Sequence, residues 1–373
     1  MKPRDKQQVK SVKELLEKKK AILTEDCGGG KTFEALYAGK KTGLPVYIVC
    51  PANVKAHWQE TADKLKMEVE ISSYNKIWAT YKTWKKKGVL ICDECHKGIG
   101  QKEFWKSNTI RAIFYLSRRC SYIFLLSATP SQHRPMDFYW LLKLTDAWEY
   151  DRDFFRHRYM SAYYNKNIRV RGRPILLDGA VSNVKELVKI FDKVRIQNFK
   201  RKLKFKIKTI KAPDTGYEEP QFQDVALWRS LVGKIKLKWF KHYLKSRGLM
   251  KKRAIYFTHH REITIELAGF LGCDYIIGGQ RATVRQKIFD NLDKHKKVVV
   301  SLKAGGEGIN ELDGFDTCFF VECNYSPLQD RQAVLRMARD KKTKVLYVNY
   351  FITKDEHTYA VNKRKHLYLS EVI

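Results

Sequence analysis

Short apolar runs alternate with longer amphipathic stretches along most of this 373-residue chain, and the alternation occurs twice. The first series contains AILT, PVYIVC, VLIC and YIFLLS, with KTFEALYAGKK and NVKAHWQETADKL between its early members. The second contains RAIYFT, DYII, KVVVSL, TCFFVE and KVLYVNYF. Alternating strand and helix patterns favour parallel sheets covered by helices on both faces. We therefore expect an α/β protein with lobes at 1–147 and 253–373, joined by a bridging insert at 148–252.

The predicted insert is irregular, aromatic and strongly basic, with turn signals at RGRP and APDTGYEEP. Its segment KLKFKIK alternates lysine with apolar residues, a period of two that places the lysines on one face of a strand. These lysines are Lys202, Lys204, Lys206 and Lys208. Such a face is either a solvated strand surface or a surface that binds along the phosphates of a nucleic acid.

The charge of the chain points to a polyanionic partner. Lys and Arg number 73 against 40 Asp and Glu, which gives a formal charge of +33. A 44% hydrophobic and 13% aromatic content excludes a disordered basic tail as the source of that charge. Nucleic acid is the first candidate, and an anionic membrane surface is disfavoured because no amphipathic anchor stands out.

Cellular location is predicted from cysteine usage and from the apolar runs. The basic start MKPRDKQQVK precedes no apolar segment, and no run of about 18 apolar residues occurs, so we expect neither secretion nor membrane spanning. Eight cysteines are too few for a disulfide scaffold, which favours a reducing, cytoplasmic protein. Cys92 and Cys95 beside His96 resemble half of a zinc site, but no second pair follows, so we expect no zinc.

A glycine loop follows the first apolar run. In TEDCGGGKT, three glycines precede Lys31 and Thr32, and a helical pattern comes next. Glycines let backbone N–H groups approach phosphates, the lysine reaches the outer phosphate oxygens, and the threonine hydroxyl binds magnesium. Glu25 stands where the usual pattern has its first glycine, so a glycine-rich turn that happens to end in Lys-Thr is the alternative.

A pair of acids follows another apolar run in VLICDECH. At the carboxyl end of a buried strand, Asp93 can hold magnesium and Glu94 can orient and deprotonate water. Taken alone, the segment could equally be a strand that ends in two surface acids. The two segments together favour a nucleotide site.

These motifs resemble motifs I and II of superfamily 2 helicases and translocases, with DECH as a variant of the DEAH box. PRDKQ is similar to the adenine-reading element of that family, which assigns this role to Gln7. YIVCPANVKAHWQE resembles motif Ia, and Ser127-Ala128-Thr129 resembles motif III, which couples nucleotide state to the nucleic-acid path. The acidic form LTEDCGGGKT and the sequence TPSQHRPMDFYWLLKL resemble the Swi/Snf-type translocase branch.

The second series continues the resemblance. VVVSLKAGGEGINEL resembles motif V, with Ser301 and three glycines at matching positions. SPLQDRQAVLRMAR is similar to motif VI, in which a helix presents Gln332, Arg336 and Arg339, the two arginines three residues apart on one face. Leu335 and Ala338 depart from the usual Asp and His of the Swi/Snf pattern.

The resemblance implies two RecA-like lobes with ATP and Mg²⁺ in the cleft between them. The implied catalytic residues are Lys31, Glu94, Arg336 and Arg339. The implied cofactor-binding residues are Gln7, Gly28, Gly29, Gly30, Lys31, Thr32, Asp93, Gly308 and Gln332, with Thr32 and Asp93 on the metal. The implied nucleic-acid contacts are Pro51, Lys55, Tyr74, Thr258, His259, Ser301 and Lys303, and Ser127 and Thr129 are the coupling residues.

The function implied is an ATP-dependent translocase on duplex or branched DNA that remodels forks or junctions and drives branch migration. One alternative is a strand-separating helicase on branched DNA or RNA. Another, from a different class, is an ATP-gated nucleic-acid-binding module that does not turn over. A P-loop kinase is disfavoured because it needs no second lobe with glycine and arginine motifs.

Overall fold

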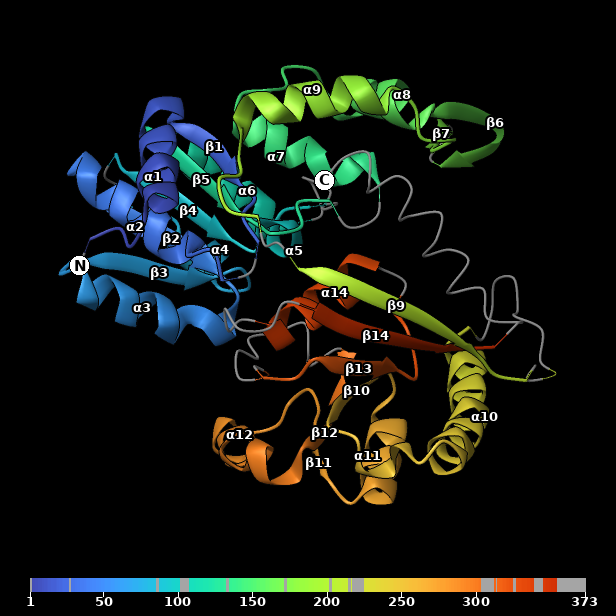
Figure 1. Ribbon diagram of the computed structural model, residues 1–373. Coiled ribbons are helices and arrows are strands. Elements are labelled where there is room, and N and C mark those ends of the chain that lie inside the picture. The colour runs from blue at the N-terminus through green and yellow to red at the C-terminus, as the bar shows by residue number, and fades with distance from the viewer. Residues whose placement is uncertain are drawn as a thin grey trace. The chain divides into compact units, whose positions relative to one another are not determined.

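The chain forms two compact units that meet in sequence at residues 201 and 202 (Figure 1). The computed structural model describes residues 2–26, 28–84, 87–100, 107–131, 134–170, 173–200, 203–213, 216, 225–302, 312, 314–324, 327–338 and 345–353. Each unit is built on its own six-stranded sheet.

The sheet of the first unit is parallel in all its pairings and has the order β3-β2-β4-β5-β1-β8. Its strands are β1 (Lys20–Leu23), β2 (Val46–Cys50), β3 (Val69–Ser73), β4 (Val89–Asp93), β5 (Tyr122–Leu126) and β8 (Arg195–Ile196). Apart from Lys20 at the start of β1 and Asp93 at the end of β4, the central strands are apolar because helices cover both faces of the sheet.

Two hydrophobic layers flank this sheet. One contains α1 (Lys6–Lys18), α2 (Lys31–Thr42) and α3 (Lys55–Lys64), whose apolar side chains pack on β1, β2 and β4. The other layer holds α4 (Ile77–Thr80), α5 (Cys95–Gly98), α6 (Asn108–Ser117), η3 (Pro135–Phe138), α7 (Tyr139–Leu144), α8 (Arg152–Met160) and α9 (Val184–Val194). The short η1 (Ala52–Val54) precedes α3, and β6 (Tyr163–Val170) and β7 (Arg173–Leu177) form an antiparallel hairpin after α8.

The sheet of the second unit is also parallel and has the order β11-β12-β10-β13-β14-β9. Its strands are β9 (Lys204–Lys211), β10 (Ala254–Thr258), β11 (Asp274–Ile276), β12 (Lys297–Ser301), β13 (Thr317–Phe320) and β14 (Val345–Ile352). One face packs against α10 (Val225–Ser246) and α11 (Arg261–Leu271), and the other against α12 (Ala282–His295) and α14 (Pro327–Leu335). The short η4 (Leu249–Lys251) follows α10, and η5 (Arg336–Ala338) follows α14.

Two parallel sheets confirm the α/β class and the two lobes predicted from the alternating pattern. Residues 148–252, predicted as a bridging insert, contribute β8 to the first sheet and β9 to the second. The alternating lysine segment forms β9, in which Lys204, Lys206 and Lys208 are exposed. None of the helices in the described part of the chain has the length and apolar composition needed to cross a membrane.

Candidate nucleotide and nucleic-acid site

Three of the sequence motifs meet at the carboxyl edge of the first sheet. Leu23 of β1 pairs with Leu126 of β5, and Leu126 pairs with Asp93 of β4, so the three strands end in one register row. The residues that follow this row carry the glycine loop, the motif III serine and Glu94. Because parallel strands end at the same edge, loops far apart in sequence are brought together there.

The glycine loop runs from β1 into the first turn of α2. Gly30 is the N-cap residue of α2 and has φ 103°, a conformation that side chains other than glycine rarely adopt. Lys31 and Thr32 therefore begin the helix, where backbone N–H groups favour an anion. Lys31 Nζ donates to the carbonyl oxygens of Glu25 at 2.5 Å and Asp26 at 3.4 Å.

The loop is packed too tightly for side chains at two of its glycines. A Cβ at Gly30 would lie 2.3 Å from Gln8 Nε2, and one at Gly29 would lie 2.9 Å from both Glu25 Oε2 and Phe199 Cδ1. Contacts this short would force a neighbouring side chain or the loop itself to shift. The φ of Gly30 therefore requires glycine at that position, and a side chain at Gly29 would have to displace Phe199 or Glu25.

Gln8, one residue after the predicted Gln7, is the glutamine that reaches this loop. Gln7 is exposed on α1, whereas Gln8 is buried and accepts a hydrogen bond from the Arg4 backbone N–H at 2.9 Å. Arg4 Nη2 donates to the Gly29 carbonyl at 2.8 Å. The amino-terminal segment thus contacts the glycine loop through Arg4 and Gln8.

Two buried carboxyl groups lie beneath the loop. Ser11 Oγ donates to Glu25 Oε1 at 2.6 Å, and Glu34 on α2 is fully buried close to Glu25. Burial, and then the charge of Glu25, raises the pKa of Glu34 to about 10. Glu34 is therefore a neutral carboxylic acid at pH 7, a feature that the motif pattern did not reveal.

The motif II aspartate is held by residues behind it. Trp58 Nε1 donates to Asp93 Oδ2 at 2.9 Å, and the Glu94 backbone N–H donates to Oδ1 at 2.9 Å. Burial, followed by the charge of Glu94, raises the pKa of Asp93 to about 6, while the Trp58 hydrogen bond and the charge of Lys31 oppose that rise. A cation bound at Asp93 would keep its carboxylate ionised.

A chain of contacts connects motif II with motif III. Glu94 has φ 46° and is the N-cap residue of α5, and its Oε2 lies 3.4 Å from His96 Nδ1. His96 is buried, and its Nδ1 forms a 2.7 Å hydrogen bond with Ser127 Oγ. The Thr129 backbone N–H donates to the same Ser127 Oγ at 3.0 Å. His96 therefore lies between the predicted catalytic acid and the two predicted coupling residues.

The residues at this edge fit a nucleotide with Mg²⁺. The two crowded glycines leave the loop backbone without side chains, and Thr32 and Asp93 offer the hard oxygen ligands that Mg²⁺ prefers. Within the described ranges no group of three or more His, Cys, Asp or Glu side chains is arranged to hold a metal. Two protein oxygens match the usual way Mg²⁺ is held, which is by one or two side chains together with substrate phosphates.

The predicted nucleic-acid contacts of the first unit differ in exposure. Pro51 follows β2 and Lys55 opens α3, and both are partly exposed. Tyr74 is buried instead, and its hydroxyl donates to the Asp93 carbonyl at 2.7 Å. Tyr74 thus lies behind motif II and supports the backbone of Asp93.

In the second unit the predicted contacts lie at the carboxyl edge of neighbouring strands β10 and β12. Thr258 ends β10 and is buried with its hydroxyl 2.7 Å from Thr264 Oγ1, and Ser301 ends β12 and is also buried. His259 is partly exposed, and its backbone N–H donates to Glu322 Oε2 at 2.8 Å.

Glu322, after β13, organises this edge and was not predicted from the sequence. Besides the backbone of His259, it accepts from the His260 backbone N–H at 3.0 Å and contacts His260 Nδ1 at 2.6 Å. Burial acts to raise the pKa of Glu322, but its bonds and charge interaction with His260 outweigh burial and lower it. The only sequence signal for Glu322 is its position directly after the apolar run TCFFV.

The motif VI segment is helical for a shorter stretch than predicted. Gln332 lies in α14, which ends at Leu335, and Arg336 begins a 3₁₀ turn, with both Gln332 and Arg336 buried. Arg339, Gly308, Lys303 and the motif V glycines Gly305 and Gly306 lie outside the described residues. Because Arg339 is not among the described residues, the shared face of the two arginines stays a prediction.

Comparison with known proteins gives matches over both units. A family model described as the helicase conserved C-terminal domain matches residues 235–341. The chain is 22% identical over 400 residues to a SWI/SNF-related matrix-associated actin-dependent regulator of chromatin subfamily A-like protein 1 homolog of Caenorhabditis elegans, covering 89% of this chain and 56% of that protein. It is also 23% identical over 432 residues to the SWI/SNF-related matrix-associated actin-dependent regulator of chromatin subfamily A-like protein 1 of Drosophila melanogaster. This match covers 96% of this chain and 54% of that protein.

A third relative has a higher identity over a shorter stretch of the chain. Protein CHROMATIN REMODELING 19 of Arabidopsis thaliana is 36% identical over 94 residues, which cover 24% of this chain and 12% of that protein. The chain spans about half the length of the two relatives that it matches along most of its own length.

Replacing Glu34 with glutamine should stabilise the first unit at alkaline pH. The folded pKa of Glu34 is raised from 4.5 to about 10, so the stability this carboxyl contributes is complete below pH 4.5 and is lost as pH rises toward 10. Glu34→Gln removes the titration, and its amide can donate to Glu25. We expect a gain on the order of 1–3 kcal/mol in unfolding free energy at pH 8.5 and a smaller gain at pH 5.

Chemical denaturation at both pH values measures this difference. Glu60→Gln, at an exposed glutamate of α3, is the matched control and should change little at either pH. A Glu34→Gln gain that is equal at pH 5 and pH 8.5 would contradict a buried neutral acid.

Proposed function

We propose, because this chain is a superfamily 2 helicase-like protein of the Swi/Snf type, that it hydrolyses ATP in response to nucleic acid and uses the energy to move along duplex or branched DNA. The names of its relatives refer to regulators of chromatin and to chromatin remodelling. Fork remodelling and branch migration are the finer form of this proposal. The preference for duplex DNA rests on family resemblance.

The observation that carries the proposal is the contact chain from motif II to motif III. A residue that activates water needs a fixed orientation, and Glu94 has His96 beside its carboxylate at 3.4 Å. His96 is in turn bonded to Ser127, which accepts from Thr129. A shift of the Ser127–Thr129 segment would therefore move His96 and change the surroundings of Glu94, which is the connection a nucleic-acid-stimulated ATPase requires.

Each residue has a defined task in this mechanism. Lys31 and the backbone of the glycine loop bind the phosphates, and Glu94 orients the attacking water and takes its proton. Thr32 and Asp93 would hold Mg²⁺, which would supply positive charge beside the phosphates. We assign Arg336 and Arg339 to the outer phosphate when the two units close. Hydrolysis then permits opening, so the grip on the DNA backbone changes once per cycle.

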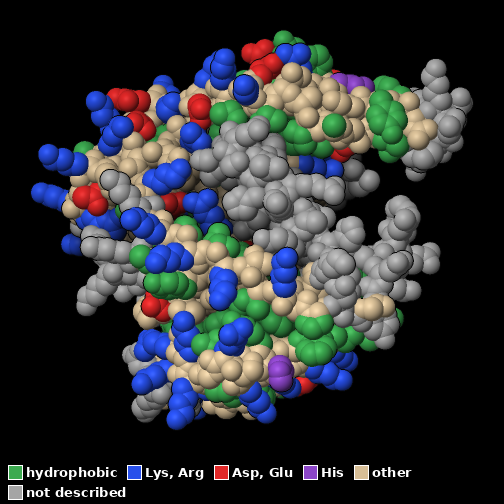
Figure 2. Space-filling model, turned by 45° about the vertical axis from the view of Figure 1, so that its right-hand side comes forward, with side chains coloured by type: hydrophobic (Ala, Val, Ile, Leu, Met, Phe, Trp, Pro, Cys, Tyr) green, Lys and Arg blue, Asp and Glu red, His purple; other side chains and the backbone are tan. Residues whose placement is uncertain are grey.

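The DNA path in this proposal follows the carboxyl edges of both sheets. Pro51 and Lys55 contact it in the first unit, and His259 and Lys303 in the second, whereas Ser301 is buried at the end of β12 and acts behind this surface. On the face drawn in Figure 2, Lys and Arg side chains are scattered over both units while acidic side chains are few. This distribution agrees with the net charge of +33 and with binding to a phosphate backbone.

Loss of the loop lysine or of the catalytic acid should abolish turnover without abolishing DNA binding. We expect Lys31→Ala and Glu94→Gln to lower DNA-stimulated ATP hydrolysis by at least about 10²-fold, because they remove phosphate binding and water activation. A phosphate-release assay with single strands, duplexes, four-way junctions and RNA measures this, and DNA binding is checked by anisotropy. Wild-type hydrolysis that no nucleic acid stimulates would refute the coupling.

Changes at His96 should separate basal hydrolysis from its stimulation. We expect His96→Ala to reduce the ratio of DNA-stimulated to basal rate by about 2- to 30-fold, the range for residues that couple two sites. His96→Asn should restore part of this ratio, because its side chain can place a polar atom close to the position of Nδ1. Equal loss of both rates in His96→Ala, with no rescue by Asn, would show that His96 serves only the fold.

DNA binding should weaken steeply with salt. Each neutralised phosphate releases a counterion, so a protein with 6–10 phosphate contacts loses about 10³- to 10⁵-fold in affinity between 50 and 200 mM salt. Duplex binding measured by anisotropy over this range tests the expectation, and a duplex with uncharged methylphosphonate linkages is the control. A flat response with ordinary duplex would contradict an electrostatic interface.

A further inference from the structure

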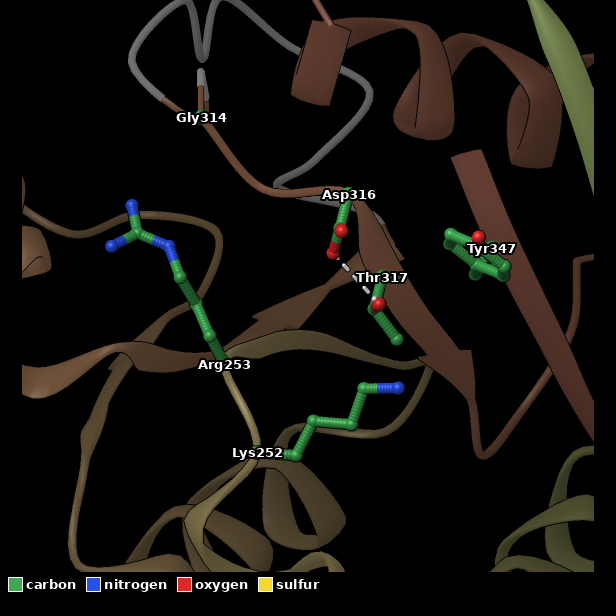
Figure 3. A pocket seen from close by; sticks show the side chains of 6 residues that line it. All are labelled: Lys252, Arg253, Gly314, Asp316, Thr317 and Tyr347. Carbon is green, nitrogen blue, oxygen red and sulfur yellow. Dashed lines mark hydrogen bonds between the residues drawn. The ribbon is translucent and has the colours of Figure 1, made fainter. Parts of the chain in front are cut away.

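A cavity of about 370 Å³ opens in the second unit at the amino edge of its sheet, opposite the edge that carries the motif residues (Figure 3). Lys252 and Arg253 precede β10, Gly314 and Asp316 precede β13, and β13 and β14 complete the lining. The lining residues are Lys252, Arg253, Gly314, Asp316, Thr317 and Tyr347. Nothing in the proposed ATPase mechanism uses this cavity.

An aromatic ring forms one wall. Tyr347 of β14 is 39% exposed, although its neighbours in the strand, Leu346 and Val348, are buried. Its register partner on β9 is Lys206, whose Nζ lies 5.3 Å from the centre of the Tyr347 ring. An exposed aromatic ring beside a cation is suited to stack a nucleobase and to place a phosphate next to it.

The polar groups in the cavity differ in what they can bind. Asp316 is exposed, and its Oδ1 accepts from Thr317 Oγ1 at 2.8 Å, the dashed contact in Figure 3. Its carboxylate has further lone pairs and only accepts hydrogen bonds, so its complement on a ligand is an N–H group. Lys252 is exposed and extends beneath Thr317, where its ammonium can bind a phosphate (Figure 3).

Arg253 closes another side of the cavity and is held in place. Its guanidinium lies over the ring of Phe315, 4.7 Å from the ring centre. The cavity therefore combines an aromatic face, a hydrogen-bond acceptor and positive charge, and its volume is within the range of sites for small ligands. A bare phosphate would use the cations alone and would be repelled by Asp316.

We propose that this cavity binds one nucleotide of a single nucleic-acid strand. The base stacks on Tyr347, an exocyclic amino group donates to Asp316, and the adjoining phosphate binds Lys252. Cytosine and adenine carry such an amino group and thymine does not. The chain would thus hold a single strand at a second place on the second unit, separate from the DNA path of the proposed function.

Photocrosslinking of the full chain tests this site without relying on ATP hydrolysis. An oligo(dC) strand with one 5-iodocytosine, irradiated with the protein in the absence of ATP, should crosslink to the peptide that contains Tyr347, as read by mass spectrometry. The matching 5-iodouracil oligo(dT) strand should crosslink there at least about 5-fold less, because it lacks the amino group. Crosslinks confined to other peptides would overturn the proposal, whether or not DNA stimulates hydrolysis.

Substitutions separate stacking, base choice and charge. We expect Tyr347→Ala to weaken oligo(dC) binding about 5- to 100-fold, the effect of losing one stacked base, and Tyr347→Phe to bind nearly as wild type. Asp316→Asn should remove the preference for oligo(dC) over oligo(dT). Lys252→Gln should weaken binding more than Lys238→Gln, a control with the same charge change at an exposed position of α10. Equal effects of the two lysine variants, or an unchanged base preference in Asp316→Asn, would contradict the proposed nucleotide site.

Free nucleotide is distinguished from a strand by competition. Unlabelled oligo(dC) should suppress the Tyr347 crosslink at far lower nucleotide concentration than dCMP does. Equal competition by dCMP would overturn the assignment to a strand.

Discussion

Crowding around the glycine loop between β1 and α2 is the constraint on which the rest of the first unit's site depends. Three side chains lie close to the glycines of this loop. They are Gln8 from α1, Glu25 from the loop itself, and Phe199 from the segment after β8. Gly30 needs glycine for its φ of 103°, and a side chain at Gly29 would displace Phe199 or Glu25, so the loop and these neighbours are closely packed. The segment containing Phe199 leads directly to residue 202, where the second unit begins. A change in the loop on binding phosphate would therefore be felt by the segment after β8 through the packed side chain of Phe199.

The alignment of strand ends makes this edge predictable from sequence. Apolar runs located β1, β2, β4, β5, β10, β12, β13 and β14, because buried parallel strands are continuous apolar segments. Once the strands were placed, parallel topology put the residues after β1, β4 and β5 at one edge. The apolar runs and the parallel topology were therefore enough to predict that Lys31, Glu94 and Ser127 lie near the same edge of the sheet. The alternating lysines of β9 were found in the same way, from a period of two.

Details that depend on a single residue of register or on tertiary contact could not be predicted. The choice between Gln7 and Gln8 depends on helical phase, which Asp5 sets by capping α1 at Gln8 N. Tyr74 follows a strand and resembles a surface aromatic in sequence, yet its hydroxyl bonds to the backbone of Asp93. The two-residue strand β8 carries no pattern of its own and exists because β1 has an open edge to pair with.

The acidic residues of the loop raise the question of how such a site can bind a triphosphate. Glu25 and Glu34 lie close together beneath Lys31, and two charged carboxylates there would oppose a polyanion. Burial resolves the conflict, because it raises the pKa of Glu34 to about 10 and keeps that carboxyl neutral. Ser11 donates to Glu25 Oε1, so this second carboxyl is held behind the loop by a hydrogen bond. Lys31 donates to carbonyl oxygens of the loop, so its ammonium stays beside the loop backbone that would bind phosphate.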